Sequence, residues 1–162
     1  MQRLLPLAER AAELLKARGE TIAVAESSTA GLISAALVAV PGASAYFVGG
    51  GVIYTAVAQR SLLDIPREQL RGIRASTEPY ARLGAQTIRT KLATTWGIAE
   101  TGATGPSGNP YGDAAGHSCI AVDGPVQRSI TLETGRSDRV DNMWAFSEAA
   151  LQLLIDCLTR PS

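Results

Sequence analysis

The chain has 162 residues, which suffices for a domain with its own core, and we predict one single domain over residues 1–162. Its 15 basic residues balance its 15 acidic residues, which excludes the net positive field that binding to nucleic acid or to an anionic membrane surface would need. The apolar runs are too short to span a bilayer, and the N-terminus is charged where a signal peptide is apolar. We therefore expect a soluble, cytoplasmic protein.

The first part of the chain alternates helical and extended patterns. Apolar residues at helical spacing predict a helix over residues 4–18, and a short β-favouring apolar run predicts a buried strand over 21–25. A second helix is expected over 29–40, where a Pro-Gly pair ends it. Three consecutive glycines then predict a bend or bulge between two strand pieces, 46–48 and 52–55.

The rest of the chain shows the same alternation around one long loop. This loop, 102–116, is too rich in Gly, Pro and Asn to be regular, and so long a loop in a compact domain is usually functional or disordered. The other elements are predicted as helices over 56–63, 79–94 and 139–158, and strands over 98–101, 118–122 and 129–133. Because helices and strands interleave, we predict an α/β fold, a three-layer α/β/α sandwich with a mostly buried mixed sheet.

The cysteines and the histidine show no metal-binding pattern. Cys119 and Cys157 stand far apart without a CxxC or Cys/His spacing, so we expect two buried thiols. His117 is the only histidine, and no carboxylate stands at the spacing that would complete a metal site with it. We predict no metal and no cofactor.

Two polar segments are candidates for a site. Glu26-Ser27-Ser28-Thr29 lies between a predicted strand and a helix, so its hydroxyls and N–H groups reach the carboxyl edge of the sheet, where α/β proteins bind ligands. The same hydroxyls could merely cap the helix, and the pattern leaves both roles open. The second segment, GATGPSG at 102–108, has glycines that let backbone amides approach an anion, although it lacks the P-loop lysine. An ordinary glycine-rich connection is its alternative.

These segments carry a resemblance when they are taken together and in order. AESSTAG, PGAS, YTAVAQRSLL, STEP and TGATGPSG resemble the motifs AES(C/M)TGG, PGSS, YSNxAKxxLL, SEP and GIAGPxGG of the CinA C-terminal domain family. The resemblance spans about residues 20–122 without gaps, and the ordered set is far more specific than any one motif. It implies a three-layer α/β/α fold and hydrolysis of the carboxamide of nicotinamide mononucleotide, by a Ser/Tyr/Lys set without a metal.

Carried over by position, the family's serine is Ser27, its tyrosine is Tyr54, and its lysine position is Gln59. A serine hydroxyl needs a base to take its proton, and a glutamine amide can orient a group but cannot act as that base. The two lysines, Lys16 and Lys91, are expected on exposed helix faces away from these motifs. The resemblance further implies substrate-binding positions at Glu26, Ser28, Thr29, Gly31, Gly102, Thr104, Gly105 and Gly108.

Two other side chains could supply a base. His117 has a suitable unperturbed pKa, but we favour a histidine with satisfied hydrogen bonds because no partner acid can be assigned. Glu26 is the other, and we favour for it a carboxylate that organises the loop. Near the last helix, the family's GDRxxVR is GRSDRVD here, with an acid where the second arginine is expected, so the phosphate-binding arginine stays unassigned.

We therefore predict an amidohydrolase-like protein of reduced activity that takes a small-molecule nucleotide substrate. Ser27 would attack the carboxamide carbon, Tyr54 would relay or donate a proton, and amides of the glycine loop would stabilise the oxyanion. The alternatives are a non-catalytic pyridine-nucleotide-binding or interaction module, and an enzyme that acts on another amide or lactam through Glu26 or His117. The triple glycine and the apolar last helix are compatible with a close subunit contact, so we also expect a homo-oligomer.

Overall fold

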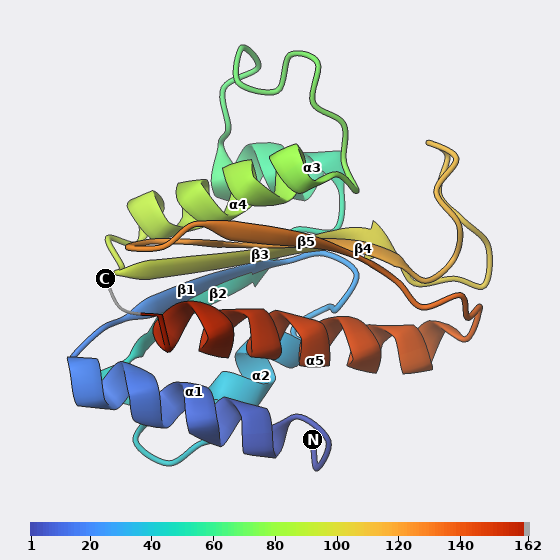
Figure 1. Cartoon of the computed structure of the whole chain (residues 1–162). Helices are drawn as coiled ribbons and strands as arrows, with labels where there is room; N and C mark the ends of the chain where they lie inside the picture. The colour runs from blue at the N-terminus through green and yellow to red at the C-terminus, as the bar shows by residue number, and fades with distance from the viewer. Residues whose placement is uncertain (161–162) are drawn as a thin grey trace.

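A mixed five-stranded sheet forms the centre of the protein in a computed structural model that describes residues 1–160 (Figure 1). The strand order is β2-β1-β3-β4-β5, with β2, β1 and β3 parallel and the β3–β4 and β4–β5 pairs antiparallel. The strands are β1 Ile22–Glu26, β2 Phe47–Val52, β3 Trp96–Ala103, β4 His117–Asp123 and β5 Arg128–Glu133. The central strands β1, β3 and β4 are almost entirely buried, so the predicted mixed, mostly buried sheet is confirmed.

Helices cover both faces of the sheet and complete the predicted three layers. In Figure 1, α1, α2 and α5 lie below the sheet, and α3 and α4 lie above it. The lower layer holds α1 Leu5–Arg18, α2 Leu32–Val38 and α5 Arg139–Leu158, and the upper layer holds α3 Ala56–Ala58 and α4 Glu78–Lys91. A 3-10 turn (η1, Ala43–Ala45) and a π turn (η2, Gln59–Leu63) complete the list. Two separate clusters of buried side chains result, one on each face.

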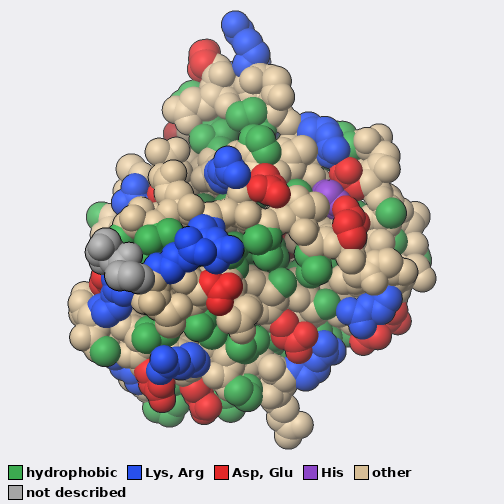
Figure 2. All heavy atoms as spheres, viewed as in Figure 1, with side chains coloured by type: hydrophobic (Ala, Val, Ile, Leu, Met, Phe, Trp, Pro, Cys, Tyr) green, Lys and Arg blue, Asp and Glu red, His purple; other side chains and the backbone are tan. Residues whose placement is uncertain are grey.

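The surface and the cysteines match the composition. Figure 2 shows acidic and basic side chains interspersed over the face in view. Cys119 packs in the cluster with α4 and Cys157 in the cluster with α5, so both are buried free thiols, as expected. Within residues 1–160, no helix combines the length and the apolar character that crossing a membrane requires.

The prediction that the triple glycine separates two strand pieces is wrong, but the register does shift directly before it: Ile22 pairs with Phe47 and Ala23 with Gly49, which leaves Val48 as a bulge-like irregularity. Gly49, Gly50 and Gly51 lie inside the continuous strand β2 and pair with residues 23–25 of β1. A Cβ atom on Gly50 would lie 2.9 Å from the carbonyl oxygen of Val24 and from the hydroxyl of Ser34. The glycine is therefore needed for a close approach of β2 to its neighbours and not for a turn.

The second helix is shorter than predicted. The expected span was 29–40, but α2 begins at Leu32 because Ala30 and Gly31 have left-handed φ values of 53° and 100°. The predicted loop 102–116 is also shorter, since β3 continues to Ala103 by pairing with His117 of β4. The predicted last helix, 139–158, is confirmed at both ends.

Candidate functional site

The three positions predicted to be catalytic line one cavity of about 310 Å³ at the carboxyl ends of β1 and β2. Ser27 directly follows β1, and Tyr54 lies two residues beyond β2, because parallel strands present their carboxyl ends at one edge. Gln59 begins the π turn η2 and also lines this cavity. A volume of this size suits a small molecule.

A second cavity of about 200 Å³ shares Tyr54 with the first. It contains the glycine-rich segment that follows β3, so the loop and the Ser27 region meet as predicted. Arg139, the first residue of α5, donates one hydrogen bond to the Gly105 carbonyl at 2.6 Å and another to the Tyr54 hydroxyl at 2.8 Å. Five of the predicted substrate-binding residues line this cavity: Ser28, Gly102, Thr104, Gly105 and Gly108.

Glu100, a buried residue of β3, holds the backbone around Ser27. Its carboxylate accepts hydrogen bonds from the N–H groups of Ser27 at 3.2 Å and Thr29 at 3.0 Å. The Ser28 hydroxyl also donates to it, as does the Ser118 hydroxyl at 3.1 Å. Burial raises the pKa of the Glu100 carboxyl, and the hydrogen bonds from Ser28 and Thr29 oppose that rise.

Glu26 turns away from the cavity and caps α2. It is 1% exposed, and its carboxylate accepts from the N–H groups of Gly31 and Ile33, each at 3.0 Å, and of Ser34 at 2.8 Å. The hydroxyl of Thr29 donates to it at 2.8 Å. The favoured interpretation of Glu26, a carboxylate that organises the loop, is the one that these bonds show. A substrate contact of Glu26, Thr29 or Gly31 stays a prediction, and their polar groups have partners inside the protein.

The Ser27 hydroxyl has no hydrogen-bond partner among residues 1–160. His117 does not line its cavity: Nε2 contacts the carbonyl oxygen of Ser76 at 2.9 Å, and Nδ1 contacts Glu133. This is the hydrogen-bonded histidine that we favoured from the sequence. Partial burial lowers the pKa of His117, but the bonds to Glu133 and Ser76 and the charges of Glu133 and Asp113 outweigh burial, so its pKa is raised.

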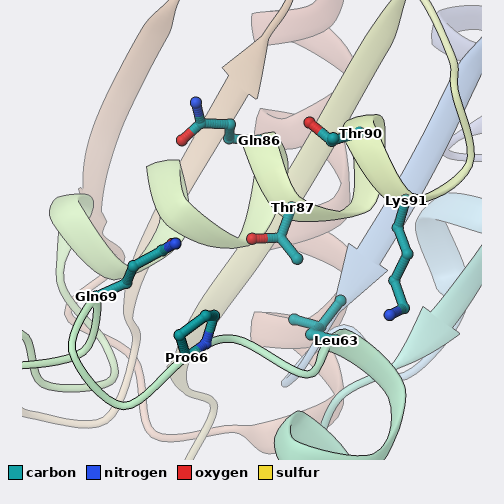
Figure 3. Close-up of a pocket in the computed structure, with 7 residues that line it drawn as sticks. All are labelled: Leu63, Pro66, Gln69, Gln86, Thr87, Thr90 and Lys91. Atoms are coloured by element: carbon teal, nitrogen blue, oxygen red, sulfur yellow. The ribbon is translucent and has the colours of Figure 1, made fainter.

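The lysines lie elsewhere, as expected. Lys16 is exposed on α1, in the layer opposite α4. Lys91 lines a third hollow of about 360 Å³ outside α4, and Figure 3 shows its side chain extending toward Leu63. This hollow is larger than the other two, but none of the predicted site residues lines it. Its lining consists of Leu63, Pro66, Gln69, Gln86, Thr87, Thr90 and Lys91. The Ser27 cavity is therefore the candidate functional site.

An ion pair joins two loops at the wall of the Ser27 cavity. Arg74 binds the carboxylate of Asp113 through two hydrogen bonds, at 2.7 Å and 2.9 Å. The Arg74 guanidinium also lies 5.4 Å from the ring centre of Tyr111, and both residues line the cavity. Hydrogen bonding to Arg74 lowers the pKa of Asp113 to about 2, so this carboxylate is ionised at neutral pH.

Glu100, Arg139 and Arg74 are absent from the set predicted from sequence. Glu100 had a usable signal, because a lone carboxylate within the apolar strand sequence WGIAETG must be buried and needs partners. Arg139 stands in the segment compared with GDRxxVR, but its contact with Tyr54 spans 85 residues of chain. No local sequence pattern indicates a contact between residues so far apart.

Known proteins are similar in sequence to this chain over most of its length. The family model described as "CinA C-terminal domain" matches residues 4–158. The chain belongs to the CinA C-terminal domain family. A CinA-like protein of Gloeobacter violaceus is 39% identical over 150 residues, which cover 91% of this chain and 35% of that protein. A CinA-like protein of Parasynechococcus marenigrum is 41% identical over 120 residues, which cover 74% of this chain and 29% of that one.

Solved structures of the CinA superfamily have the same fold. Competence damage-inducible protein A of Klebsiella pneumoniae aligns with a TM-score of 0.91 and 26% identity, covering 98% of this chain and 99% of that one. The competence/damage inducible protein CihA of Agrobacterium tumefaciens gives 0.89 and 28%, covering 98% and 96%. The chain spans about a third of the length of the curated CinA-like relatives but nearly all of these solved chains.

Proposed function

We propose that the Ser27 cavity binds nicotinamide mononucleotide and slowly hydrolyses its carboxamide to nicotinic acid mononucleotide and ammonia. One observation carries the proposal: Ser27, Tyr54 and the position of the family's lysine, Gln59, line the same cavity. Membership of the CinA C-terminal domain family supports the choice of ligand.

The contacts suggest a role for each residue. The Ser27 backbone is held by Glu100, while its hydroxyl stays free to attack the carboxamide carbon. Tyr54 accepts a hydrogen bond from Arg139, so it can pass its phenolic hydrogen to the leaving nitrogen as it takes the proton of Ser27, and water then hydrolyses the acyl-enzyme and restores the Ser27 hydroxyl. Gln59 cannot remove the proton of Ser27, because an amide is not basic near neutral pH. Turnover is slow for that reason.

A second candidate function is binding without turnover. It is favoured by the absence of a free base at the cavity, within residues 1–160: the carboxylate of Glu26 caps α2, Glu100 holds the backbone beneath Ser27, and His117 is bonded elsewhere. Under this alternative the protein still binds the nucleotide but no longer hydrolyses it.

Ammonia release from nicotinamide mononucleotide separates the two functions. We expect slow release by the wild-type protein, none by Ser27→Ala, and a gain of at least about 100-fold in Gln59→Lys, because a positioned general base contributes on that order. Lys91→Ala removes a lysine outside the cavity and serves as the matched control, with an unchanged rate.

Calorimetry with the same nucleotide completes the test. Binding without ammonia release in the wild-type protein would support the second function. If neither the wild-type protein nor Gln59→Lys binds or hydrolyses the nucleotide, the proposed ligand is wrong.

A further inference from the structure

The side-chain amide of Gln59 contains an unusual buried group. Gln59 is 4% exposed, and its Nε2 is the one buried side-chain nitrogen or oxygen in residues 1–160 without a hydrogen-bond partner. Leaving a buried donor unpaired is costly, and the other buried polar side chains around it are all paired. The residue lines the Ser27 cavity, and no hydrogen bond holds its terminal amide, so rotation of this amide would turn Nε2 from the interior toward an acceptor in the cavity.

A glutamine recognises a different chemical group from the lysine of the family. A lysine ammonium only donates hydrogen bonds, and its charge favours an anionic partner. A glutamine amide donates through Nε2 and accepts through Oε1, so it can form two reciprocal hydrogen bonds with another primary carboxamide. A carboxylate has no hydrogen to donate to Oε1, so one of its oxygens would face the lone pairs of Oε1 and be repelled by them.

From this chemistry we infer that Gln59 is a specificity residue that makes the cavity select a primary carboxamide over the corresponding carboxylate. In this pair, Nε2 of Gln59 donates to the carbonyl oxygen of the ligand, and the ligand NH₂ group donates to Oε1. The inference rests on the proposed function, because it concerns the same cavity and a ligand of the same class. It adds that the substrate is held more tightly than its hydrolysis product.

Two ligands that differ only at this group provide the test, by calorimetry at one pH and one salt concentration. We expect the wild-type protein to bind nicotinamide mononucleotide at least about tenfold more tightly than nicotinic acid mononucleotide, the ratio that one buried hydrogen-bond mismatch produces. Because the acid also carries an extra charge, the readout is the change of this ratio between proteins. Gln59→Met keeps the length of the side chain and should bring the ratio to within about threefold of unity.

Two further variants sharpen the result. Gln59→Lys should invert the preference toward the acid, since the ammonium attracts the carboxylate. Gln69→Leu changes an exposed glutamine of the hollow outside α4 and should leave the wild-type ratio unchanged. Circular dichroism confirms that each variant is folded.

The outcomes separate this inference from the proposed function. Equal binding of both ligands by the wild-type protein, or a preference that survives in Gln59→Met, overturns the role of Gln59 while the ligand class stands. Failure of the wild-type protein to bind either nucleotide overturns the proposed function and this inference together.

Discussion

Two buried carboxylates set the position of Ser27 at the scale of single residues. Glu100 lies beneath the Ser27-Ser28-Thr29 segment and binds its backbone, and Glu26 binds the first N–H groups of α2. The Thr29 hydroxyl contacts both carboxylates, at 2.8 Å from Glu26 and 3.1 Å from Glu100. The geometry around Ser27 is therefore fixed from inside the fold, where the hydrogen bonds are shielded from water.

Glu26→Ala tests this arrangement. The variant leaves three N–H groups and the Ser34 hydroxyl at the α2 entry without their acceptor, while the Thr29 hydroxyl keeps Glu100 as its acceptor. We expect a loss of about 3 kcal/mol in the free energy of unfolding, because unpaired buried donors retain their desolvation cost. Urea denaturation followed by circular dichroism measures this loss.

The control is Glu9→Ala, at an exposed glutamate of α1. Its free energy of unfolding should change by no more than about 0.5 kcal/mol. A loss below about 1 kcal/mol in Glu26→Ala would show that water replaces this cap easily.

The sequence indicated the convergence of Ser27, Tyr54 and Gln59 because two of them follow parallel strands and all three stand at positions of ordered motifs, although Gln59 replaces the lysine of its motif. It did not indicate the internal pairing of Ser28 and Thr29, since their partner Glu100 lies more than 70 residues away in the chain. Hydroxyls that bind a substrate and hydroxyls that bind a buried carboxylate have the same local pattern. Only the position of the third strand separates the two roles.

At the scale of elements, β2 depends on its glycines for different reasons. At Gly50 an added Cβ would lie 2.9 Å from a backbone oxygen of β1, which cannot move without disturbing the sheet. At Gly49 the nearest atom is a methyl carbon of Leu92 at 3.3 Å, at the end of a flexible side chain. Adjacent glycines therefore differ in their tolerance to the same substitution.

Gly50→Ala should destabilise the protein by about 2 kcal/mol, the cost of overpacking a site that cannot relax. Gly49→Ala should cost less than about 1 kcal/mol, because Leu92 can move and alanine restricts the unfolded chain. Thermal and urea denaturation of the two variants side by side give the comparison. Equal destabilisation would contradict the assigned contacts of Gly50.

Most elements were predictable because their patterns are local. The apolar spacing and the caps located α1, α4 and α5 to within a few residues, and the β-favouring runs located the strands. The start of α2 and the continuity of β2 were not predictable, since both depend on long-range contacts. Glu26 takes the N–H groups that would extend the helix pattern, and Val24 lies where a side chain on Gly50 would be.

For the whole molecule, we expect stability to depend on pH through the only histidine. The pKa of His117 in the folded protein is raised above its usual value of 6.5, so folding favours the protonated form. The contribution of His117 to the free energy of unfolding is complete below about pH 6.5, and it is lost as the pH rises through the pKa of the folded state. Urea midpoints measured between about pH 5 and pH 8.5 should therefore fall toward high pH.

His117→Gln should flatten this dependence, because no other histidine titrates in that range. A slope that survives the substitution would point to Glu100, whose raised pKa acts in the same direction. A wild-type midpoint that rises over the interval would contradict the raised pKa of His117.

The amino terminus of α2 also limits how an anionic ligand can lie. Its partial positive charge is already neutralised by Glu26, a counterion tethered to the same chain, so an incoming phosphate would have to displace it. A mononucleotide that places its carboxamide at Gln59 would therefore find its phosphate donors away from α2, at Arg74 of the same cavity, which is paired with Asp113, or beyond Tyr54. Arg139 and the glycine loop lie beyond Tyr54, in the second cavity. With its phosphate there and its carboxamide in the Ser27 cavity, the nucleotide would bind in one orientation.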